Sequence, residues 1–134
     1  MIEGDWFKGR ITGTYGIGGS SLGGLISCYA SYTRPLKFPT SICMSSSFWW
    51  NNEDFNNQIL STQKVHNGVK FYIDSGDSGP SQDGRNQTIT VYQHLLKIGY
   101  KSNQTLFYYL DKGGQHSEAY WGKRFNIPLA QLYP

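Results

Sequence analysis

The sequence predicts an α/β fold built on a mainly parallel sheet of about four strands with helices on both faces. Short β-rich runs alternate with helical patterns along the chain, which is typical of parallel strands joined by crossover helices. The chain has 134 residues, and its 38% hydrophobic and 16% aromatic content is enough for the core of one domain. A glycine-rich turn, residues 18–24, joins the first predicted strand directly to a helix.

The first half of the chain contains two predicted strands and two predicted helices. The first strand is predicted at residues 14–18, and a helix follows the glycine-rich turn because apolar residues recur there at i, i+3, i+4 and i+7. These apolar residues are Leu22, Leu25, Ile26 and Tyr29. The helix is expected to end near Arg34, before a proline. A buried strand is predicted at residues 41–45, and a weak helix at residues 52–61.

The second half repeats the alternation. Residues 69–73 are rich in β-forming side chains, and they lead into a predicted turn-rich loop from residue 74 to residue 80. A clear amphipathic helix begins near Asn86 and ends with Gly99 as the residue after its last turn. A fourth strand is predicted at residues 106–110, and a last helix begins near residue 117.

Composition limits the kinds of partner that the chain can bind. Twelve basic and nine acidic residues give a net charge of +3 and form no run, so neither a nucleic-acid site nor a membrane patch is expected. Residues 1–5 do not resemble a signal peptide, which favours a cytoplasmic protein, with secretion possible for a longer form. Cys28 and Cys43 lie among hydrophobic neighbours, and this favours buried free thiols.

The glycine-rich turn contains the pattern G-x-S-x-G at residues 19–23, with Ser21 at its centre. A serine on a sharp turn between a strand and a helix needs small neighbours, because side chains there would collide with the packed backbone. The backbone N–H of Leu22 follows the serine at the start of the helix, where it could stabilise a developing oxyanion. The pattern therefore indicates a nucleophile elbow with half of an oxyanion hole.

A serine nucleophile needs a histidine to accept its proton and a carboxylate to orient that histidine. Of the three histidines, His66 precedes a predicted strand and His94 lies on an exposed helical face. His116 follows the fourth strand on a loop that begins with Gly113 and Gly114. In a parallel sheet the carboxyl ends of the strands lie at one edge, so His116 is the predicted base.

The carboxylate is less sharply defined by position. Four aspartates lie near strand ends: Asp74, Asp77, Asp83 and Asp111. Asp111 belongs to the strand that precedes His116, and Asp74 comes too early in its loop. The choice lies between Asp77 and Asp83, and Asp83 directly precedes a helix from which a loop carboxylate could reach the neighbouring loop. Both could instead be turn residues or helix caps.

Four motifs in order resemble the putative esterase family, which includes enterochelin-esterase-like hydrolases, esterase D and feruloyl esterases. The motifs are Gly-Ser-Ser-Leu-Gly-Gly at 19–24, Ser-Ser-Ser-Phe-Trp-Trp-Asn at 45–51, Tyr-Ile-Asp-Ser-Gly at 72–76, and Gly-Gly-Gln-His at 113–116 followed by Trp121. The resemblance implies the C-terminal half of an α/β-hydrolase, with Ser21 as nucleophile and His116 as base. It favours Asp83 over Asp77, because the third loop is lengthened here.

The resemblance also implies a substrate and a pocket. The substrate would be a small-molecule ester, no cofactor or metal is expected, and Phe48, Trp49 and Trp50 would line the acyl or alcohol pocket. For at least one of the two tryptophans, ordinary core packing is the alternative interpretation.

This sequence departs from the family pattern before the elbow. Family members have further strands there, and residues 1–13 form only a polar lead segment, so residues 14–134 are expected to be a partial hydrolase domain with one open edge at its first strand. A missing N-terminal half is a possible partner. Two functions remain open: serine carboxylic-ester hydrolysis through an acyl-enzyme, and a catalytically inactive fragment or binding remnant of an esterase.

Overall fold

The chain forms a four-stranded, all-parallel sheet with helices on both faces, which confirms the predicted fold class. The computed structural model describes residues 13–62 and 64–134, so the predicted lead segment lies outside the described residues except for Gly13. The sheet order is β1-β2-β3-β4, with strands β1 (Gly16–Ser20), β2 (Thr40–Met44), β3 (Lys70–Gly76) and β4 (Leu106–Asp111). The helices are α1 (Leu22–Thr33), α2 (Trp50–Asp54), η1 (Phe55–Ile59), η2 (Leu60–Thr62), η3 (Gln82–Gly84), α3 (Arg85–Ile98), α4 (Glu118–Arg124) and α5 (Asn126–Leu132).

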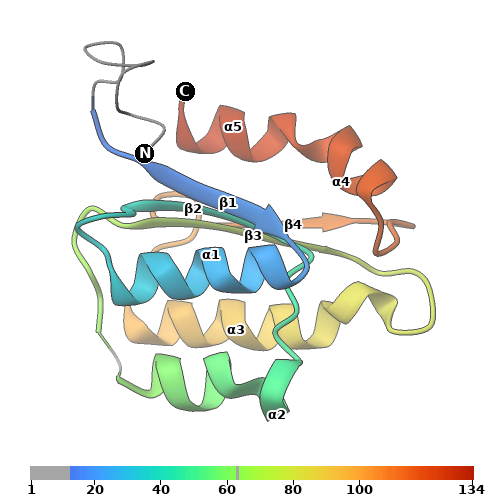
Figure 1. The fold of residues 1–134 in the computed structure, drawn as a ribbon, viewed down its shortest axis with the longest axis horizontal. Helices are drawn as coiled ribbons and strands as arrows, with labels where there is room; N and C mark the ends of the chain where they lie inside the picture. The colour runs from blue at the N-terminus through green and yellow to red at the C-terminus, as the bar shows by residue number, and fades with distance from the viewer. Residues whose placement is uncertain (1–12, 63) are drawn as a thin grey trace, which may run out of the picture.

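The order of the strands explains the layers. Because neighbouring parallel strands follow one another in sequence, right-handed crossovers place the connecting helices on one face. Helices α1, α2 and α3 lie on that face, whereas α4 and α5 cross the opposite face and return the C-terminus toward β1 (Figure 1). In the described part of the chain, no helix is both long enough and apolar enough to cross a bilayer.

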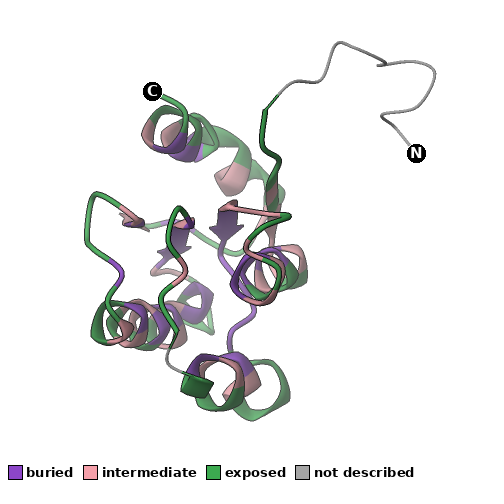
Figure 2. Cartoon of the chain, turned by 90° about the vertical axis from the view of Figure 1, so that its left-hand side faces the viewer, coloured by how far each residue is buried: buried purple, intermediate pink, exposed green. Residues whose placement is uncertain are grey.

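Two apolar clusters hold the layers together, and the buried residues gather between sheet and helices (Figure 2). The larger cluster joins the sheet to α1 and α3 through Cys28 on α1, Phe71 on β3 and Val91 on α3, each 0% exposed. Burying a side chain such as Phe71 or Val91 contributes roughly 1.5–3 kcal/mol. The smaller cluster, which includes Ile42 and Leu132, joins the sheet to the C-terminal helices. Apolar packing therefore fixes a layer of helices to each face of the sheet.

Strand β1 lies at one edge of the sheet, and its outer side pairs with no other strand among the described residues. A groove of about 630 Å³ runs along this edge. Its apolar walls include Ile17, Met44, Trp121 and Leu129. Unpaired N–H and C=O groups beside an apolar groove form a surface on which a further strand can pair.

Each strand differs from its predicted range by a few residues, and the shifts of β1 and β3 bear on the site. Strand β1 begins at Gly16 and continues to Ser20, so that Ser21 follows the strand directly. Strand β3 continues through Gly76, so the prediction that the loop begins at Asp74 was wrong. Asp74 is buried against a guanidinium, and this tertiary contact outweighs the turn preference of the local sequence. The predicted weak helix at residues 52–61 is an irregular succession of α2, η1 and η2.

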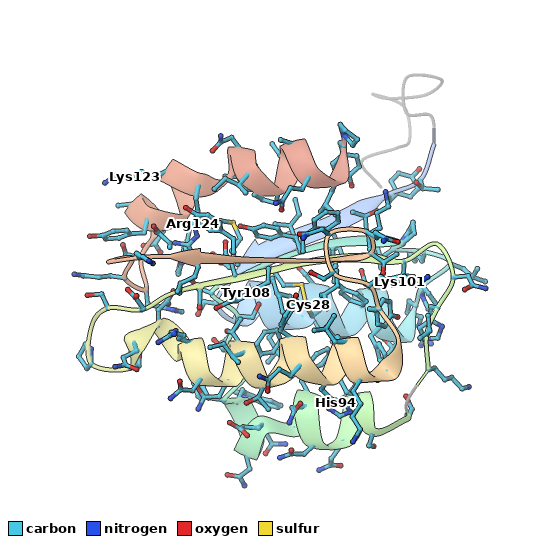
Figure 3. All side chains as sticks on the ribbon, turned by 180° about the vertical axis from the view of Figure 1, so that it is seen from behind. Cys28, His94, Lys101, Tyr108, Lys123 and Arg124 are labelled. Carbon is cyan, nitrogen blue, oxygen red and sulfur yellow. A yellow bond between two sulfur atoms is a disulfide. The ribbon has the colours of Figure 1, made fainter. Side chains whose placement is uncertain are left out.

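The prediction of free thiols was wrong, because Cys28 and Cys43 form a disulfide. Cys28 faces the sheet from α1, and Cys43 lies in β2, with the two Cα atoms 6.0 Å apart. Helix α1 is the crossover between β1 and β2 and packs against both strands, so a cysteine on its inner face meets one on the next strand. A residue spacing alone does not reveal this contact. Figure 3 shows the disulfide beside the label of Cys28.

The disulfide gives a stability prediction. Replacing both Cys28 and Cys43 with alanine should lower the free energy of unfolding by about 3 kcal/mol, since the bond closes a loop with a sequence separation of 15. Urea unfolding with and without a reductant measures this: the reductant should destabilise the natural chain and leave the double variant unchanged. Two alkylatable thiols in the denatured, unreduced protein would contradict the disulfide.

Candidate active site

Ser21 occupies the turn between β1 and α1 in an unusual backbone conformation, with φ 58° and ψ −123°. Its backbone N–H donates to the carbonyl of Met44, at 3.0 Å, which ties the turn to the end of β2. A Cβ at Gly19 would lie 2.7 Å from the carbonyl carbon of Gly23, and a Cβ at Gly24 would lie 2.9 Å from the oxygen of Met44. The elbow therefore requires glycine at both positions.

Ser21, His116 and Asp83 lie in a continuous chain of hydrogen bonds. The Oγ of Ser21 is 2.8 Å from Nε2 of His116, and Nδ1 of His116 is 2.6 Å from Oδ1 of Asp83. An ionised carboxylate only accepts, so the Nδ1 of His116 donates to it and Nε2 is free to accept from Ser21. The Asp83 side chain is 0% exposed and the His116 side chain 40% exposed. The chain thus runs from a buried carboxylate to an accessible hydroxyl.

Asp77, the other candidate carboxylate, lies elsewhere. Its Oδ1 accepts a hydrogen bond from the backbone N–H of Gly113, at 2.7 Å, and so ties its own loop to the loop that leads to His116. The structure therefore places Asp83, and not Asp77, against the imidazole. The rings of Trp121 and His116 also form a T-shaped pair, with their centroids 5.0 Å apart and an angle of 89° between their planes.

The remaining oxygen of Asp83 has two donors of its own. Its Oδ2 accepts from the Oγ of Ser45 and from the backbone N–H of Gly76, both at 2.5 Å. Ser45 directly follows β2, and Gly76 ends β3, so the ends of two central strands fix the carboxylate. Sequence analysis did not single out Ser45 as a site residue, although a serine at the carboxyl end of a buried strand is a usable signal.

A buried arginine connects to the same group of residues (Figure 3). Nη2 of Arg124 donates to the Oγ of Ser45, at 2.7 Å, while Nε and Nη2 bind both oxygens of Asp74, each at 2.9 Å. Its Nη1 donates to Oδ2 of Asp111, also at 2.9 Å. Burial alone would lower the pKa of Arg124, but the Asp74 hydrogen bonds and the two nearby carboxylates raise it. Arg124 was also missed in the sequence.

Tyr72 completes the surroundings of Asp74. Its hydroxyl donates to Oδ2 of Asp74, at 2.9 Å. Burial raises the pKa of Tyr72 above its ordinary value, and the neighbouring Asp74 carboxylate raises it further. The hydroxyl therefore keeps its proton and remains a donor to the carboxylate.

A second serine lies beside the elbow. The Oγ of Ser47 is 3.2 Å from the Oγ of Ser21, and its backbone N–H donates to the carbonyl of Ser21, at 3.0 Å. When Ser21 donates to His116, its oxygen can accept, so Ser47 becomes the donor in this pair. Sequence analysis assigned no role to Ser47.

Three residues of the site have backbones in the left-handed region. The φ angle is 58° at Ser21, 40° at Ser45 and 52° at Asp83. Such conformations cost about 1–3 kcal/mol each in residues other than glycine, and they persist where the surrounding structure enforces them. Their concentration around one hydrogen-bonded chain marks this edge of the sheet as the candidate site.

Leu22 is the first residue of α1. The first N–H groups of a helix have no acceptor inside the helix, and the helix dipole makes this end favourable for negative charge. The N–H of Leu22, directly after Ser21, is thus suited to bind an oxyanion that forms on a group attached to the Ser21 oxygen.

The three predicted pocket residues lie in different surroundings in the structure. Phe48 is 1% exposed and stacks on Phe55 in the core, because the chain turns inward directly after β2, so its ring does not lie at the surface of the site. Trp49 is 55% exposed and borders a cavity of about 250 Å³ beside His116. Trp50 is 48% exposed and borders a separate apolar cavity of about 430 Å³. That second cavity also touches Leu22.

Residues 8–132 match the family described as putative esterase. The chain belongs to the putative esterase family.

A relative of this esterase-family chain is the uncharacterized protein YbbA of Bacillus subtilis (strain 168), with 31% identity over 137 residues. The match covers 99% of this chain and 54% of YbbA, so the chain spans about half the length of that relative.

Solved structures share the fold of this esterase-family chain. The enterochelin esterase of Shigella flexneri matches with a TM-score of 0.68 and 22% identity, over 87% of this chain and 30% of its own. A ferulic acid esterase matches with a TM-score of 0.65 and 16% identity, over 92% and 54%. The siderophore hydrolase EstB of Aspergillus nidulans matches with a TM-score of 0.61 and 20% identity, over 87% and 48%.

Proposed function

We propose that the protein hydrolyses carboxylic esters through an acyl-enzyme formed on Ser21. The observation that carries the proposal is the hydrogen-bonded chain from Ser21 through His116 to Asp83, set on a strained turn at the carboxyl end of a parallel sheet. Membership of the putative esterase family supports it. Geometry of this kind turns a weakly nucleophilic hydroxyl into a nucleophile.

The reaction follows from the hydrogen bonds. The Oγ of Ser21 attacks the ester carbonyl carbon while its proton passes to Nε2 of His116, and Asp83 stabilises the imidazolium. The N–H of Leu22 binds the oxyanion of the tetrahedral intermediate. His116 then gives the proton to the departing alkoxide, which leaves as the alcohol. A water molecule, deprotonated by His116, attacks the acyl group and releases the acid, and Ser21 regains its proton.

The exposed side chain of Trp49, beside the imidazole of His116, indicates where part of the substrate would bind. Trp49 and His116 border the same cavity, so a group attached to the scissile ester would contact the Trp49 ring while its carbonyl meets Ser21. The apolar cavity at Trp50 and Leu22 begins on the other side of the elbow. We assign the two cavities to the two sides of the ester.

A fluorophosphonate probe tests the proposal directly. The probe phosphonylates an activated serine, so peptide mapping of the complete protein, with the preceding half present, should find the label on Ser21 and on no other serine. Replacing His116 with alanine should abolish the labelling, because the hydroxyl then has no base. Labelling that persists in the Ser21→Ala variant, or a folded protein that takes up no label, would contradict the assignment of Ser21.

A catalytically inactive form of the 134-residue chain is the second candidate, and the open edge of β1 favours it. We infer that the active protein places a further strand on this edge and a second oxyanion donor near Leu22. The coverage of 54% of the Bacillus relative is consistent with a longer active protein. Loss of one oxyanion donor alone costs roughly 2.7–4 kcal/mol of transition-state stabilisation.

This inference predicts the behaviour of residues 1–134 expressed alone. An exposed strand edge beside an apolar groove favours aggregation, and an incomplete oxyanion hole slows hydrolysis. We expect poor solubility or loose packing and little turnover of a p-nitrophenyl ester, with both restored when the preceding half of a family member is supplied. Size-exclusion chromatography, near-UV circular dichroism and the ester assay measure this. A compact monomer with turnover that Ser21→Ala abolishes would contradict the prediction.

We also infer that the protein works in an oxidising compartment, contrary to the cytoplasmic location that its first residues favoured. The disulfide between Cys28 and Cys43 supports this, since such bonds persist mainly outside reducing cell interiors. Alkylation of the protein isolated from its native cells distinguishes the two locations.

A further inference from the structure

The buried charges around Arg124 do not balance. One guanidinium lies among three carboxylates: Asp74 and Asp111 in direct contact, and Asp83 with its Oδ2 3.9 Å from Nη2. Asp74 and Asp83 are fully buried, and Arg124 is 4% exposed in its side chain. One guanidinium and one carboxylate would suffice for a structural ion pair. The third carboxylate is the one that faces His116.

Ser45 connects the guanidinium to that carboxylate in a defined direction. Arg124 can only donate and an ionised Asp83 can only accept, so the Ser45 hydroxyl must accept from Nη2, at 2.7 Å, and donate to Oδ2, at 2.5 Å. The hydroxyl proton therefore has one possible orientation. Hydrogen bonds that involve charged groups are about twice as strong as neutral ones.

The backbone of Ser45 is held by the same cluster. Its N–H donates to Oδ1 of Asp74, at 2.8 Å, and Arg124 in turn donates hydrogen bonds to both carboxylate oxygens of Asp74. Ser45 has a φ of 40°, which a serine adopts only when its surroundings enforce it. Glycine would satisfy this conformation more easily. The presence of serine there points to a use for the hydroxyl.

We propose that Arg124 is a positioning residue that acts through Ser45 to hold the Asp83 carboxylate in place and aimed at His116. The proposal rests on the proposed function of Ser21, His116 and Asp83. The Ser45 and Gly76 donors hold Oδ2, which leaves Oδ1 directed at Nδ1 of the imidazole. When His116 takes the Ser21 proton, the carboxylate is already in place to stabilise the new positive charge.

Ser45→Gly is the main test, because it removes the hydroxyl and relieves the backbone conformation at once. We expect kcat to fall about 10- to 100-fold with KM unchanged, the size expected when a hydrogen bond to a charged group is lost. The melting temperature should stay the same or rise. A purely structural role predicts the reverse: lower stability or no change in kcat.

Two further variants refine the test in the full protein. Ser41→Ala is the matched control, since Ser41 is equally buried, lies near the start of β2, and its hydroxyl has no hydrogen-bond partner among the described residues. It should leave kcat within about twofold of the natural protein. Arg124→Lys keeps the charge and loses the fork that reaches both Asp74 and Ser45, so it should lower kcat as Ser45→Gly does.

A spectroscopic readout separates this proposal from the proposed function. The Nδ1 proton of His116, shared with Asp83, should give a far-downfield NMR signal in the natural protein and in Ser41→Ala, and should be shifted or lost in Ser45→Gly. If Ser45→Gly keeps both full kcat and this signal while Ser21→Ala is inactive, the positioning role is wrong and the proposed function stands. If the natural protein has no turnover and Ser21 takes no label, the proposed function is wrong, and the proton signal alone decides the role of Ser45.

Discussion

Replacing Ser21 with alanine is expected to lower kcat for ester hydrolysis by about 10⁴-fold or more, judged by hydrolases that lose their nucleophile. The Oγ of Ser21 is the only atom of the hydrogen-bonded chain that can attack a carbonyl, with His116 as its base at 2.8 Å. Turnover of a p-nitrophenyl ester by the protein with the preceding half of a family member supplied measures the loss. Removal of this one oxygen leaves the fold intact, because Ser21 holds the elbow through its backbone.

The neighbouring serine provides the control for this experiment. Ser20 ends β1 directly before the elbow and takes no part in the hydrogen-bonded chain. Ser20→Ala should therefore keep kcat within about twofold. Turnover that survives Ser21→Ala at the natural rate, or that Ser20→Ala reduces equally, would move the nucleophile away from Ser21.

Replacing Asp83 with asparagine is expected to lower kcat by about 10³- to 10⁴-fold. An amide in place of the carboxylate can present its NH₂ group to Nδ1 of His116, which turns the imidazole to the tautomer that cannot accept the Ser21 proton. The variant also loses the charge that stabilises the imidazolium. Steady-state kinetics should show the loss in kcat, with KM changed far less.

Asp77→Asn is the matched control, since it changes the same group on the same loop. Asp77 accepts only from the N–H of Gly113, and an amide oxygen can still accept this hydrogen bond, so kcat should change little. A larger loss for Asp77→Asn than for Asp83→Asn would move the carboxylate role to Asp77. Equal and small losses would indicate a Ser–His dyad that works without a carboxylate.

The spacing of apolar residues was sufficient to predict the regular helices and strands. It was insufficient for segments whose conformation depends on tertiary contacts. Helix α3 was predictable because its apolar spacing and its closing Gly99 are local signals. The extension of β3 through Asp74 was not, since the residues after Ile73 have the composition of a turn. Arg124, 50 residues along the chain, gives Asp74 a buried partner and so allows the strand to continue.

The same distinction holds at the candidate site. The elbow around Ser21 and the loop of His116 carry local signatures, glycines next to a reactive side chain, that can be recognised one segment at a time. The supporting groups carry weaker signals: Ser45 is marked only by its place at the carboxyl end of a buried strand, and Ser47 and Arg124 resemble ordinary polar residues until the ends of the strands are brought together. Phe48 shows the opposite case. Its motif suggested a residue that lines a pocket, but its ring is buried in the core.

The sequence by itself determined the alternation of strands and helices, the position of the elbow, and the histidine at the end of the fourth strand, because each depends on neighbours a few residues away. The sequence favoured Asp83 over Asp77, but only the tertiary structure shows the contact of Asp83 with His116, the disulfide from Cys28 and the connection from Arg124. All of these join residues at the edges or faces of different elements of the sheet. Their contacts follow from strand order and crossover packing, which no local spacing encodes.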